Sequence, residues 1–346
     1  MSGNKLLLAF SVLAVLLAVT VWQFNARDSE DARASSDVSV KLPKLKKDEI
    51  DELSISAPEK KAVSFKKNDK TWQLTSPLTA AADTSSIDTA LGKLEELEVI
   101  GVGATKKENH EKLEVTEPKA VHVVAKKDGK PVLDVLIGAY RSGNTMLREP
   151  QSDIVAVVKG SIKYAFEKDV KDWRDKVVVE ASSEQVKAIS FQNAKGTYSF
   201  VKDGTEWKQA PGDKPLPNFE SGKIVSLVGT ATTMRAQDFA ADGVTEDAAG
   251  VGAKPEGVVK LTTTSDAGEQ QIVLHVGQKQ GEGYYLKRIG KDPIFVVSQF
   301  AGERMLSTAD KFVKDEPPKT AAAPKPSNVI EVNPIGSSGK KPVHGH

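Results

Sequence analysis

The fold is decided by two stretches that read alike, VSFKKNDKTWQLTSP at residues 63–77 and YSFVKDGTEWKQAP at residues 198–211. In each stretch, a short alternating segment reaches a turn signal and resumes in a segment that contains a tryptophan. The turn residues Asn68-Asp69 and Asp203-Gly204 accept the positive φ that tight hairpins require. Each stretch therefore predicts a β-hairpin. The two tryptophans are 135 positions apart, which indicates a duplication.

The same order of signals continues beyond each hairpin. An apolar stripe at helical spacing follows in both halves, and in the first half it begins with the capping-box form Ser85-Ser86-Ile87-Asp88. Four short strands come next, in which Gly138 corresponds to Gly277, and a helical segment closes each half. The apolar residues expected on these helices are Ile87, Leu91, Leu94 and Leu97, then Tyr164, Phe166, Val170 and Trp173 in the first half, and Ile224, Leu227, Val228 and Ala231, then Met305, Leu306, Ala309 and Phe312 in the second.

Runs of hairpin strands with only two helices per half predict the α+β class and exclude a doubly wound parallel sheet. We expect two tandem homologous lobes of antiparallel sheet with two helices each. The first α+β repeat is placed at residues 48–180 and the second at residues 181–314. At about 130 residues, each lobe is large enough to bury a core of its own.

One long apolar run, residues 6–24, lies near the N-terminus. As a helix it spans roughly 28 Å, close to the hydrocarbon thickness of a bilayer. Lys5 precedes the run and acidic residues follow it, so the positive-inside rule keeps residues 1–5 in the cytoplasm. We expect a single-pass transmembrane signal anchor in the inner (cytoplasmic) membrane, with the C-terminal domains in the periplasm or outside.

A cleaved signal peptide is the alternative, because Ala32-Arg33-Ala34 has the small-x-small form of a cleavage site. Both interpretations export the rest of the chain. Residues 26–47 are polar and charged, and we expect a flexible linker there. Residues 315–346 are rich in proline, alanine and lysine and are expected to form a disordered tail.

Composition excludes several classes of function. The chain has 48 basic and 47 acidic side chains, which argues against a nucleic-acid partner. It has no cysteine, which excludes disulfides, thiolate metal sites and a lipid attached to an N-terminal cysteine. Two lobes of this size need no disulfides, although the exported compartment would permit them.

The residues also resemble a known family. The resemblance covers nearly all of residues 48–314 and is to a bacterial domain-of-unknown-function family often encoded beside gliding-motility-type ABC transporters. Its segments here are Trp72, Leu113 to Pro118, Leu136-Ile137-Gly138, Ile154 to Val158 and Asp172-Trp173-Arg174-Asp175-Lys176, and in the second copy Val276-Gly277, Gly283 to Leu286 and Asp292 to Val297.

The chain departs from the family pattern in two places. Lys112-Leu113 replaces a Gly-Leu pair, and the second copy ends at Ala309-Asp310-Lys311-Phe312 without the arginine. The family has no established catalytic residue. The resemblance therefore implies a location and a partnership, namely an anchored extracytoplasmic protein that works with a transport system.

Candidate chemical groups in the sequence are few. The glycine clusters Gly101-Val102-Gly103 and Gly250-Val251-Gly252 do not stand between a strand and a helix, so we expect ordinary loops and not phosphate cradles. His122 and His275 lie in strand patterns on a solvated or partly buried face, and His110 lies in a charged, solvated loop. We expect no metal site and no cofactor.

Charged side chains offer two further candidates. A carboxylate pair for acid–base chemistry is conceivable at Glu95 and Glu98, or at Asp172 and Asp175, although solvation is the default. An anionic ligand or partner is conceivable at four cations in corresponding regions of the two lobes, Arg141, Arg148, Lys287 and Arg288. Scattered surface charge is the commoner explanation, so no catalytic residue is assigned.

These observations favour a membrane-anchored extracytoplasmic binding or scaffold protein that is not an enzyme. It is expected to contact the membrane through residues 6–24 and to have protein partners in an ABC-type transport or envelope complex. The alternative is an extracytoplasmic enzyme or receptor that acts on envelope glycan or peptide in a groove between the lobes. The surface between the lobes distinguishes the scaffold from the enzyme or receptor, since a pocket with converging acids or cations favours the enzyme or receptor.

Overall fold

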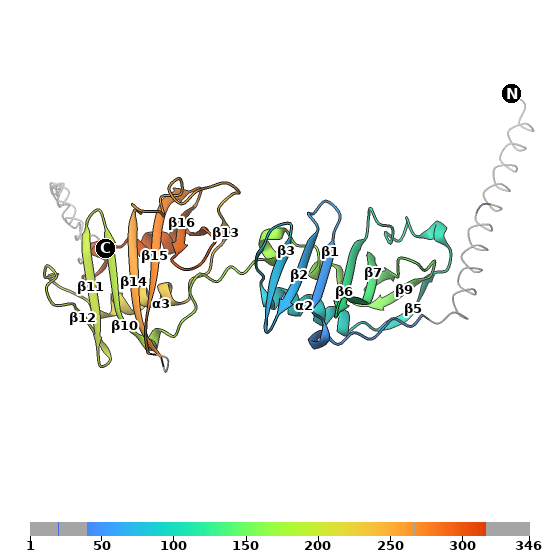
Figure 1. The fold of residues 1–346 in the computed structure, drawn as a ribbon, viewed down its shortest axis with the longest axis horizontal. Helices are drawn as coiled ribbons and strands as arrows, with labels where there is room; N and C mark the ends of the chain where they lie inside the picture. Colours follow the sequence, from blue (N-terminus) through green and yellow to red (C-terminus); the bar gives the residue numbers. More distant parts are fainter. Residues whose placement is uncertain (1–19, 21–39, 266–267, 316–346) are drawn as a thin grey trace, which may run out of the picture.

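The structure is a computed structural model that describes residues 20, 40–265 and 268–315 (Figure 1). Two antiparallel sheets follow one another along the chain, one of nine strands and one of eight. Within the described residues, no helix is both long enough and apolar enough to cross a bilayer. Apart from Thr20, the predicted anchor at residues 6–24 lies outside those residues, as do the linker up to Ser39 and the tail from Glu316 onward.

The first unit is built on the nine-stranded sheet, in the order β4-β3-β2-β1-β6-β7-β8-β9-β5. Its elements are η1 (Lys47–Glu49), β1 (Glu52–Ser56), β2 (Val63–Asn68), β3 (Thr71–Ser76), β4 (Ala80–Ala81), α2 (Thr84–Glu95), β5 (Val99–Ala104), η2 (Lys107–Asn109), β6 (Val121–Lys127), β7 (Lys130–Arg141), β8 (Asn144–Arg148), β9 (Val155–Lys159), η3 (Lys163–Ala165) and η4 (Val170–Trp173).

The second unit is built on the eight-stranded sheet, in the order β12-β11-β10-β14-β15-β16-β17-β13. Its elements are η5 (Ser183–Gln185), β10 (Val186–Asn193), β11 (Gly196–Asp203), β12 (Glu206–Gln209), α3 (Ser221–Thr232), β13 (Asp238–Phe239), β14 (Gly257–Ser265), β15 (Gly268–Gln280), β16 (Gly283–Arg288), β17 (Phe295–Ser298), α4 (Gln299–Met305) and η6 (Ala309–Lys311).

Apart from β4, the strands of the two sheets follow the same order. Each sheet starts from the predicted tryptophan hairpin, β2–β3 in one and β11–β12 in the other, and ends with the strand that follows its helix. The hairpin turns have positive φ at Asp69 and Gly204, as their sequences predict. The α+β class is confirmed, and in both units the strands pair antiparallel.

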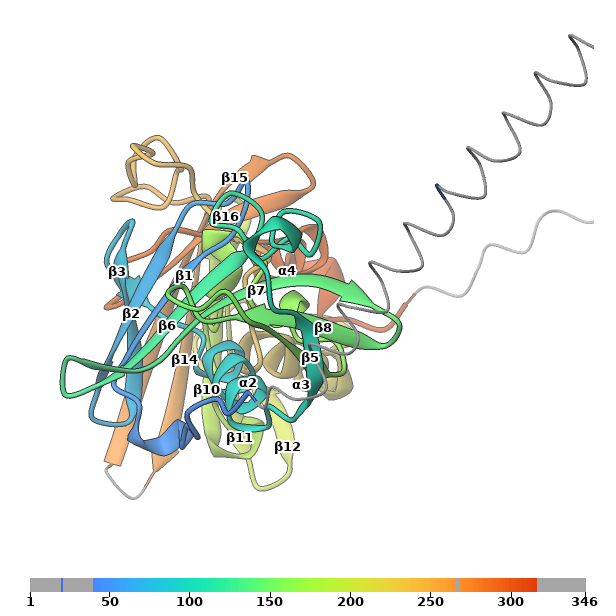
Figure 2. The same ribbon diagram turned by 90° about the vertical axis from the view of Figure 1, so that its right-hand side faces the viewer.

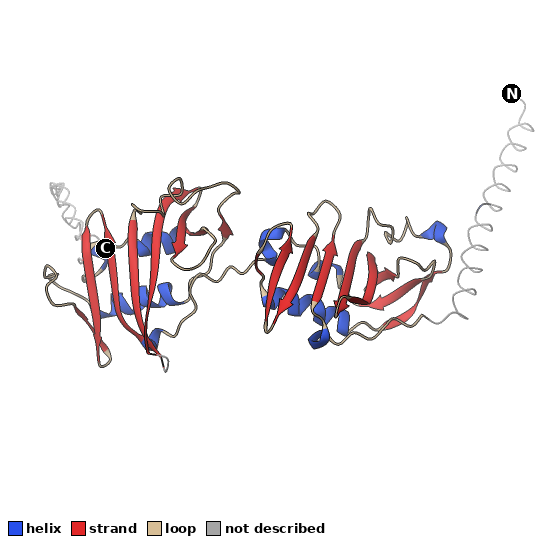
Figure 3. Cartoon of the chain, in the orientation of Figure 1, coloured by secondary structure: helices blue, strands red, loops and turns tan. Residues whose placement is uncertain are grey.

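Each unit has its own core between the sheet and its long helix. Ile87, Leu91 and Leu94 of α2 pack into the first core, and Ile224 and Leu227 of α3 pack into the second. The two helices lie behind their sheets in the view of Figure 3. Figure 2 looks along the long axis and shows α2 and α3 next to each other in projection, on the same side of that axis.

A close backbone approach recurs at the two glycines that the sequence pairs. A Cβ added at Gly138 would lie 2.4 Å from the carbonyl oxygen of Leu113, and one added at Gly277 would lie 2.1 Å from that of Ala249. In both units the residue after the glycine donates a backbone hydrogen bond to that same carbonyl, at 2.9 Å and 3.0 Å. Glycine is needed because a side chain would push the loop off the strand.

The closing helices differ from the prediction. In the second unit α4 ends at Met305, the first of the four predicted apolar residues, and the rest of the predicted segment contains only the short 3-10 helix η6. In the first unit the predicted helix is divided into the two 3-10 pieces η3 and η4. Capping explains the difference. Ser298 accepts a hydrogen bond from the backbone of Ala301 at the start of α4, whereas Ile162 before η3 offers no side-chain acceptor. The described residues therefore contain one α-helix in the first unit and two in the second.

Two smaller expectations were also wrong. Gly101-Val102-Gly103 is not a loop but part of edge strand β5, where register shifts against β9 accommodate the extra residues. The predicted linker at residues 26–47 is not flexible throughout, because Leu45 is only 3% exposed and packs into the first core with Leu42 beside it.

Candidate functional site

The junction between the two units is the candidate site. Trp173 is buried in the first core and Val178 in the second, so the chain passes from one core to the other in four residues. This connector is bonded on both sides. Asp175 donates its backbone N–H to Ala81 of β4, and the backbone oxygen of Lys176 accepts from Ala236 of the second unit. Figure 1 shows the units end to end, with β3 and β13 on facing sides.

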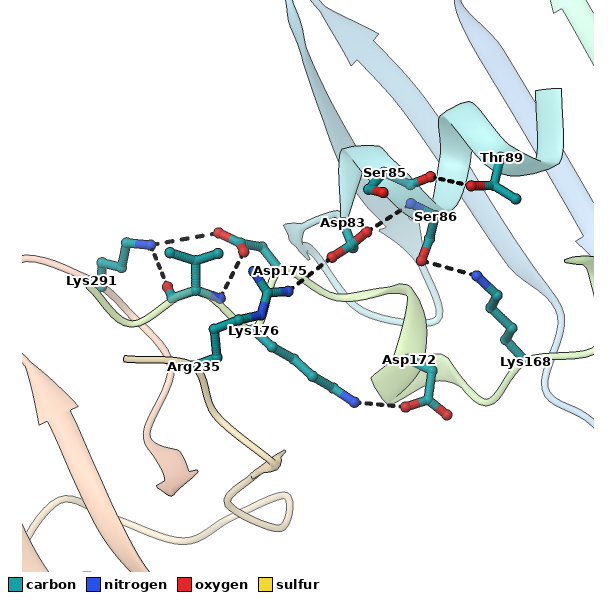
Figure 4. A network of polar contacts seen from close by, with 11 residues as sticks. Asp83, Ser85, Ser86, Thr89, Lys168, Asp172, Asp175, Lys176, Arg235 and Lys291 are labelled. Atoms are coloured by element: carbon teal, nitrogen blue, oxygen red, sulfur yellow. Dashed lines mark hydrogen bonds and ion pairs between the residues drawn. The ribbon is translucent and has the colours of Figure 1, made fainter. Parts of the chain in front are cut away.

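Three ion pairs connect the units or the connector across this junction. Lys171 lies 2.8 Å from Asp238, Arg235 lies 3.4 Å from Asp83, and Lys291 lies 3.6 Å from Asp175. Figure 4 shows the last two pairs, and Lys291 also donates to the backbone oxygen of Val177. Exposed pairs of this kind contribute little stability, so their main effect is on the relative orientation of the units.

Asp238 titrates below its ordinary range. Its burial acts to raise the pKa, but the hydrogen bonds from Lys171 and from the backbone N–H of Phe239 outweigh that effect and lower it. The same hydrogen bond raises the pKa of Lys171. The junction pair is therefore fully charged at neutral pH.

Arg174 crosses the junction in a different way. Its guanidinium carbon stands 3.6 Å from the centre of the Phe239 ring, so a side chain of the first unit stacks on edge strand β13 of the second. Among the described residues, none accepts a hydrogen bond from its buried Nε. Burial lowers the pKa of Arg174, while Asp242 and Asp238 act to raise it. A cation with an unused Nε donor is thereby held between the units.

Two cavities border this stack, and both are lined by Arg174 and Phe239. The first has a volume of 390 Å³ and the second of 600 Å³. The smaller cavity lies between β4 of the first sheet and the segment of the second unit from Gly290 to Pro293. Its size is within the range of small-molecule sites, about 300–1,000 Å³.

The histidines proposed from sequence lie apart from this junction. His122 and His275 are partly buried on strands, as predicted. Nε2 of His122 lies 2.7 Å from Asp134, and Nδ1 of His275 lies 2.8 Å from the carbonyl oxygen of Val251. His110 was predicted to be solvated and is not. It is 3% exposed, and its Nε2 lies 2.8 Å from the carbonyl oxygen of Asp153, in a loop distant in sequence.

The proposed carboxylates are each engaged by a different partner. Glu95 accepts from the backbone N–H of Lys47, Glu98 pairs with Lys159, and Asp172 pairs with Lys176. Asp175 faces Lys291 across the junction. No group of three histidine, aspartate or glutamate side chains in the described part of the chain is arranged to hold a metal ion. Each of these four carboxylates therefore already has a structural partner.

The proposed anion-binding cations are used for structure. Arg148 donates to the carbonyl oxygens of Val115, Glu149, Pro150 and Ser152, and so closes the loops around β8. Arg141 and Lys287 likewise donate to loop carbonyls, and Arg288 donates to the carbonyl oxygen of Val178, at the end of the connector. Of the four, only Arg288 touches the region between the units.

Sequence reasoning did not select Arg174 or Phe239 as a site. The only signal available was that the segment Asp172 to Lys176 contains an arginine that the matching end of the second half lacks.

Comparison with known proteins gives a family but no named relative. Searches of the curated proteins and of the solved structures returned no match. The model of the family described as "Domain of unknown function (DUF4340)" matches residues 72–249, just over half of the 346 residues. The match runs from β3, through the connector, to the loop beyond β13, and so includes Arg174 and Phe239. The chain therefore belongs to the DUF4340 family.

Proposed function

We propose that this protein is a membrane-anchored extracytoplasmic binding or scaffold protein, not an enzyme, and an accessory component of an ABC-type transport or envelope complex. The observation behind the proposal is the combination of one apolar run, residues 6–24, with two successive sheet units whose candidate catalytic groups are all engaged in structural contacts. In this proposal the units are two tandem copies of one domain, and the first lies closer to the inner membrane.

The matched contacts around α2 and α3 support the duplication. Before α2, Asp83 donates its backbone N–H to the carbonyl oxygen of Trp173, and before α3, Glu220 donates to that of Phe312. Together with the shared strand order, this repeated contact at the same point of both units favours descent from one domain. Two similar units on one tether can engage two partner sites at once, which raises the effective affinity.

Topology can be tested directly because the chain has no cysteine of its own. A single cysteine is introduced before the apolar run (Ser2→Cys) or in the exposed β10–β11 turn (Lys195→Cys), and intact cells are treated with a membrane-impermeant maleimide. We expect labelling of the turn variant only. Labelling of both variants, or of neither until the cells are lysed, would reject the extracytoplasmic placement.

The partnership is tested by crosslinking native membranes before solubilisation, with the anchor intact. The proposal expects the protein in crosslinked species that contain transporter or envelope subunits. A matched sample whose residues 6–24 are replaced by an unrelated anchor separates binding by the two units from association through the anchor. Recovery of the protein only as a free monomer would refute the scaffold proposal.

A second candidate, a receptor for an envelope ligand, is favoured by the cavities at the junction. An enzyme that acts on envelope glycan or peptide is less well supported, because the proposed carboxylates have separate structural partners.

A further inference from the structure

We propose that the junction binds a ligand with a single carboxylate and a small apolar body, and that Arg174 is the residue that holds the carboxylate. The site is the 390 Å³ cavity between β4 and the second unit. The inference goes beyond the proposed function, since it concerns a ligand and is independent of membrane partners.

Arg174 is not required for the fold of its own unit. The second unit has an equivalent position, because Ala82 forms an antiparallel bridge with Arg174 and Phe219 forms one with Val313. The residues just before them, Trp173 and Phe312, are both fully buried. The second unit thus makes the same connection with a valine. The long charged side chain at Arg174 therefore acts outside its own unit.

The guanidinium of Arg174 is oriented but not satisfied. Phe239 covers one of its faces at 3.6 Å, and its Nε is buried without an acceptor among the described residues. Three neighbouring cations differ, since Lys171, Arg235 and Lys291 each face a carboxylate. A buried donor without a partner is costly, and an oxyanion that accepted hydrogen bonds from Nε and from one terminal N–H group of the guanidinium would remove that cost.

The chemistry of the walls selects the kind of oxyanion. A guanidinium fork matches either a carboxylate or a phosphate. Lys291 and Asp175 pair with each other in the wall of the smaller cavity, which leaves the carboxylate of Asp292 beside Arg174. A doubly charged phosphate there meets more repulsion than a carboxylate with one charge. The remaining wall is apolar, with Ala80, Pro293 and Phe295 among its residues, which favours a ligand with a short hydrocarbon or peptide body.

The test is calorimetric titration of the full chain in detergent with four probes. N-acetyl-dialanine supplies a peptide carboxylate, its C-terminal amide is the uncharged control, butyrate represents a free carboxylic acid, and inorganic phosphate represents the competing oxyanion. We expect N-acetyl-dialanine to bind at one site at least about tenfold more tightly than the amide or phosphate. If butyrate also binds, with the same dependence on Arg174, a simple carboxylic acid is sufficient as the ligand. If only N-acetyl-dialanine binds, the ligand is a peptide C-terminus.

Three variants assign the binding to the junction. Arg174→Val places the residue of the second unit at the equivalent position and is expected to weaken binding at least about tenfold, while thermal unfolding shows that the fold persists. Arg174→Lys retains the charge but loses the planar fork, and is expected to bind with intermediate affinity. Arg235→Gln removes the ion pair with Asp83 and so controls for a change in the arrangement of the units. Because Arg235 does not line the cavity, we expect a much smaller loss of affinity than in Arg174→Val.

Several results would overturn the assignment. No binding of either carboxylate to the unaltered protein would remove the site, and tighter binding of phosphate would make the selectivity argument wrong. An equal loss of affinity in Arg174→Val and Arg235→Gln would show that both substitutions act only through the arrangement of the units.

Discussion

Gly277→Ala offers the sharpest test of how each unit is held together. The substitution adds one methyl group on β15, where the loop before β14 approaches most closely. The new Cβ would lie 2.1 Å from the carbonyl oxygen of Ala249 and 2.7 Å from Cγ1 of Val251. The closer atom belongs to the backbone and cannot rotate away, so the loop has to move.

The cost follows from three terms. Forcing an extra methyl group into a packed site costs about 1–3 kcal/mol. Moving the loop also breaks the 3.0 Å backbone hydrogen bond from Gln278 to Ala249, which is worth about 1 kcal/mol. Alanine loses less backbone entropy on folding than glycine, which returns about 0.4–1 kcal/mol. We expect a net loss of about 2–3 kcal/mol in the free energy of unfolding of the second unit.

Hydrogen exchange with mass spectrometry separates the two units. A loss of this size accelerates exchange of the β14 and β15 amides about 30- to 150-fold, with little change in β6 and β7. Gly138→Ala should produce the converse pattern. Gly229→Ala in α3 is the matched control, because no atom lies within 4 Å of its added Cβ, and it should slow exchange slightly.

An unchanged exchange rate in Gly277→Ala would show that the loop moves without cost and would refute the reasoning. Acceleration in both units at once would contradict the conclusion that each core is independent.

Two further predictions concern the helix start and the junction. Asp83→Ala removes the 2.7 Å cap hydrogen bond from Ser86 and should lower the stability of the first unit by about 1 kcal/mol. Glu220→Ala acts at a helix start without a side-chain cap and should change the stability of the second unit by less than about 0.5 kcal/mol. Equal effects of the two substitutions in hydrogen-exchange measurements would contradict the capping argument. Because the pKa of Asp238 is lowered in the folded protein, its pair with Lys171 contributes its full stability above the ordinary aspartate pKa. That stability is lost as the pH falls through the lower pKa of the folded state. Energy transfer between dyes on the two units should therefore change only below about pH 4. Asp238→Asn should abolish that transition, and its persistence would assign the transition to another group.

The hairpins and the repeated order of elements could be predicted because their signals are local. Turn residues such as Asp69 and Gly204 act within a few positions, and the correspondence of Gly138 with Gly277 follows from spacing alone. The first closing helix was predicted wrongly because its apolar spacing is helical but Ile162 provides no cap. Apolar spacing indicates which face is buried, but the capping residue decides whether a short helix forms.

The candidate site depends on contacts that sequence spacing does not reveal. Arg174 and Phe239 are in different units, and their stack depends on how the connector sets one unit against the other. His110 illustrates the same limit, since its charged sequence neighbours indicate a solvated side chain, while the carbonyl of Asp153 and the surrounding loop bury it.

The short connector also has a mechanical consequence. Any tension applied between the two ends of the molecule passes from the first core to the second through the residues between Trp173 and Val178. The ion pairs and the Arg174–Phe239 stack are the weakest links beside that covalent path, whereas the sheets are held by long ladders of hydrogen bonds. Under load these contacts are expected to break before the hydrogen-bond ladders of either sheet, so the cavity beside Arg174 is the first part of the molecule whose shape would change.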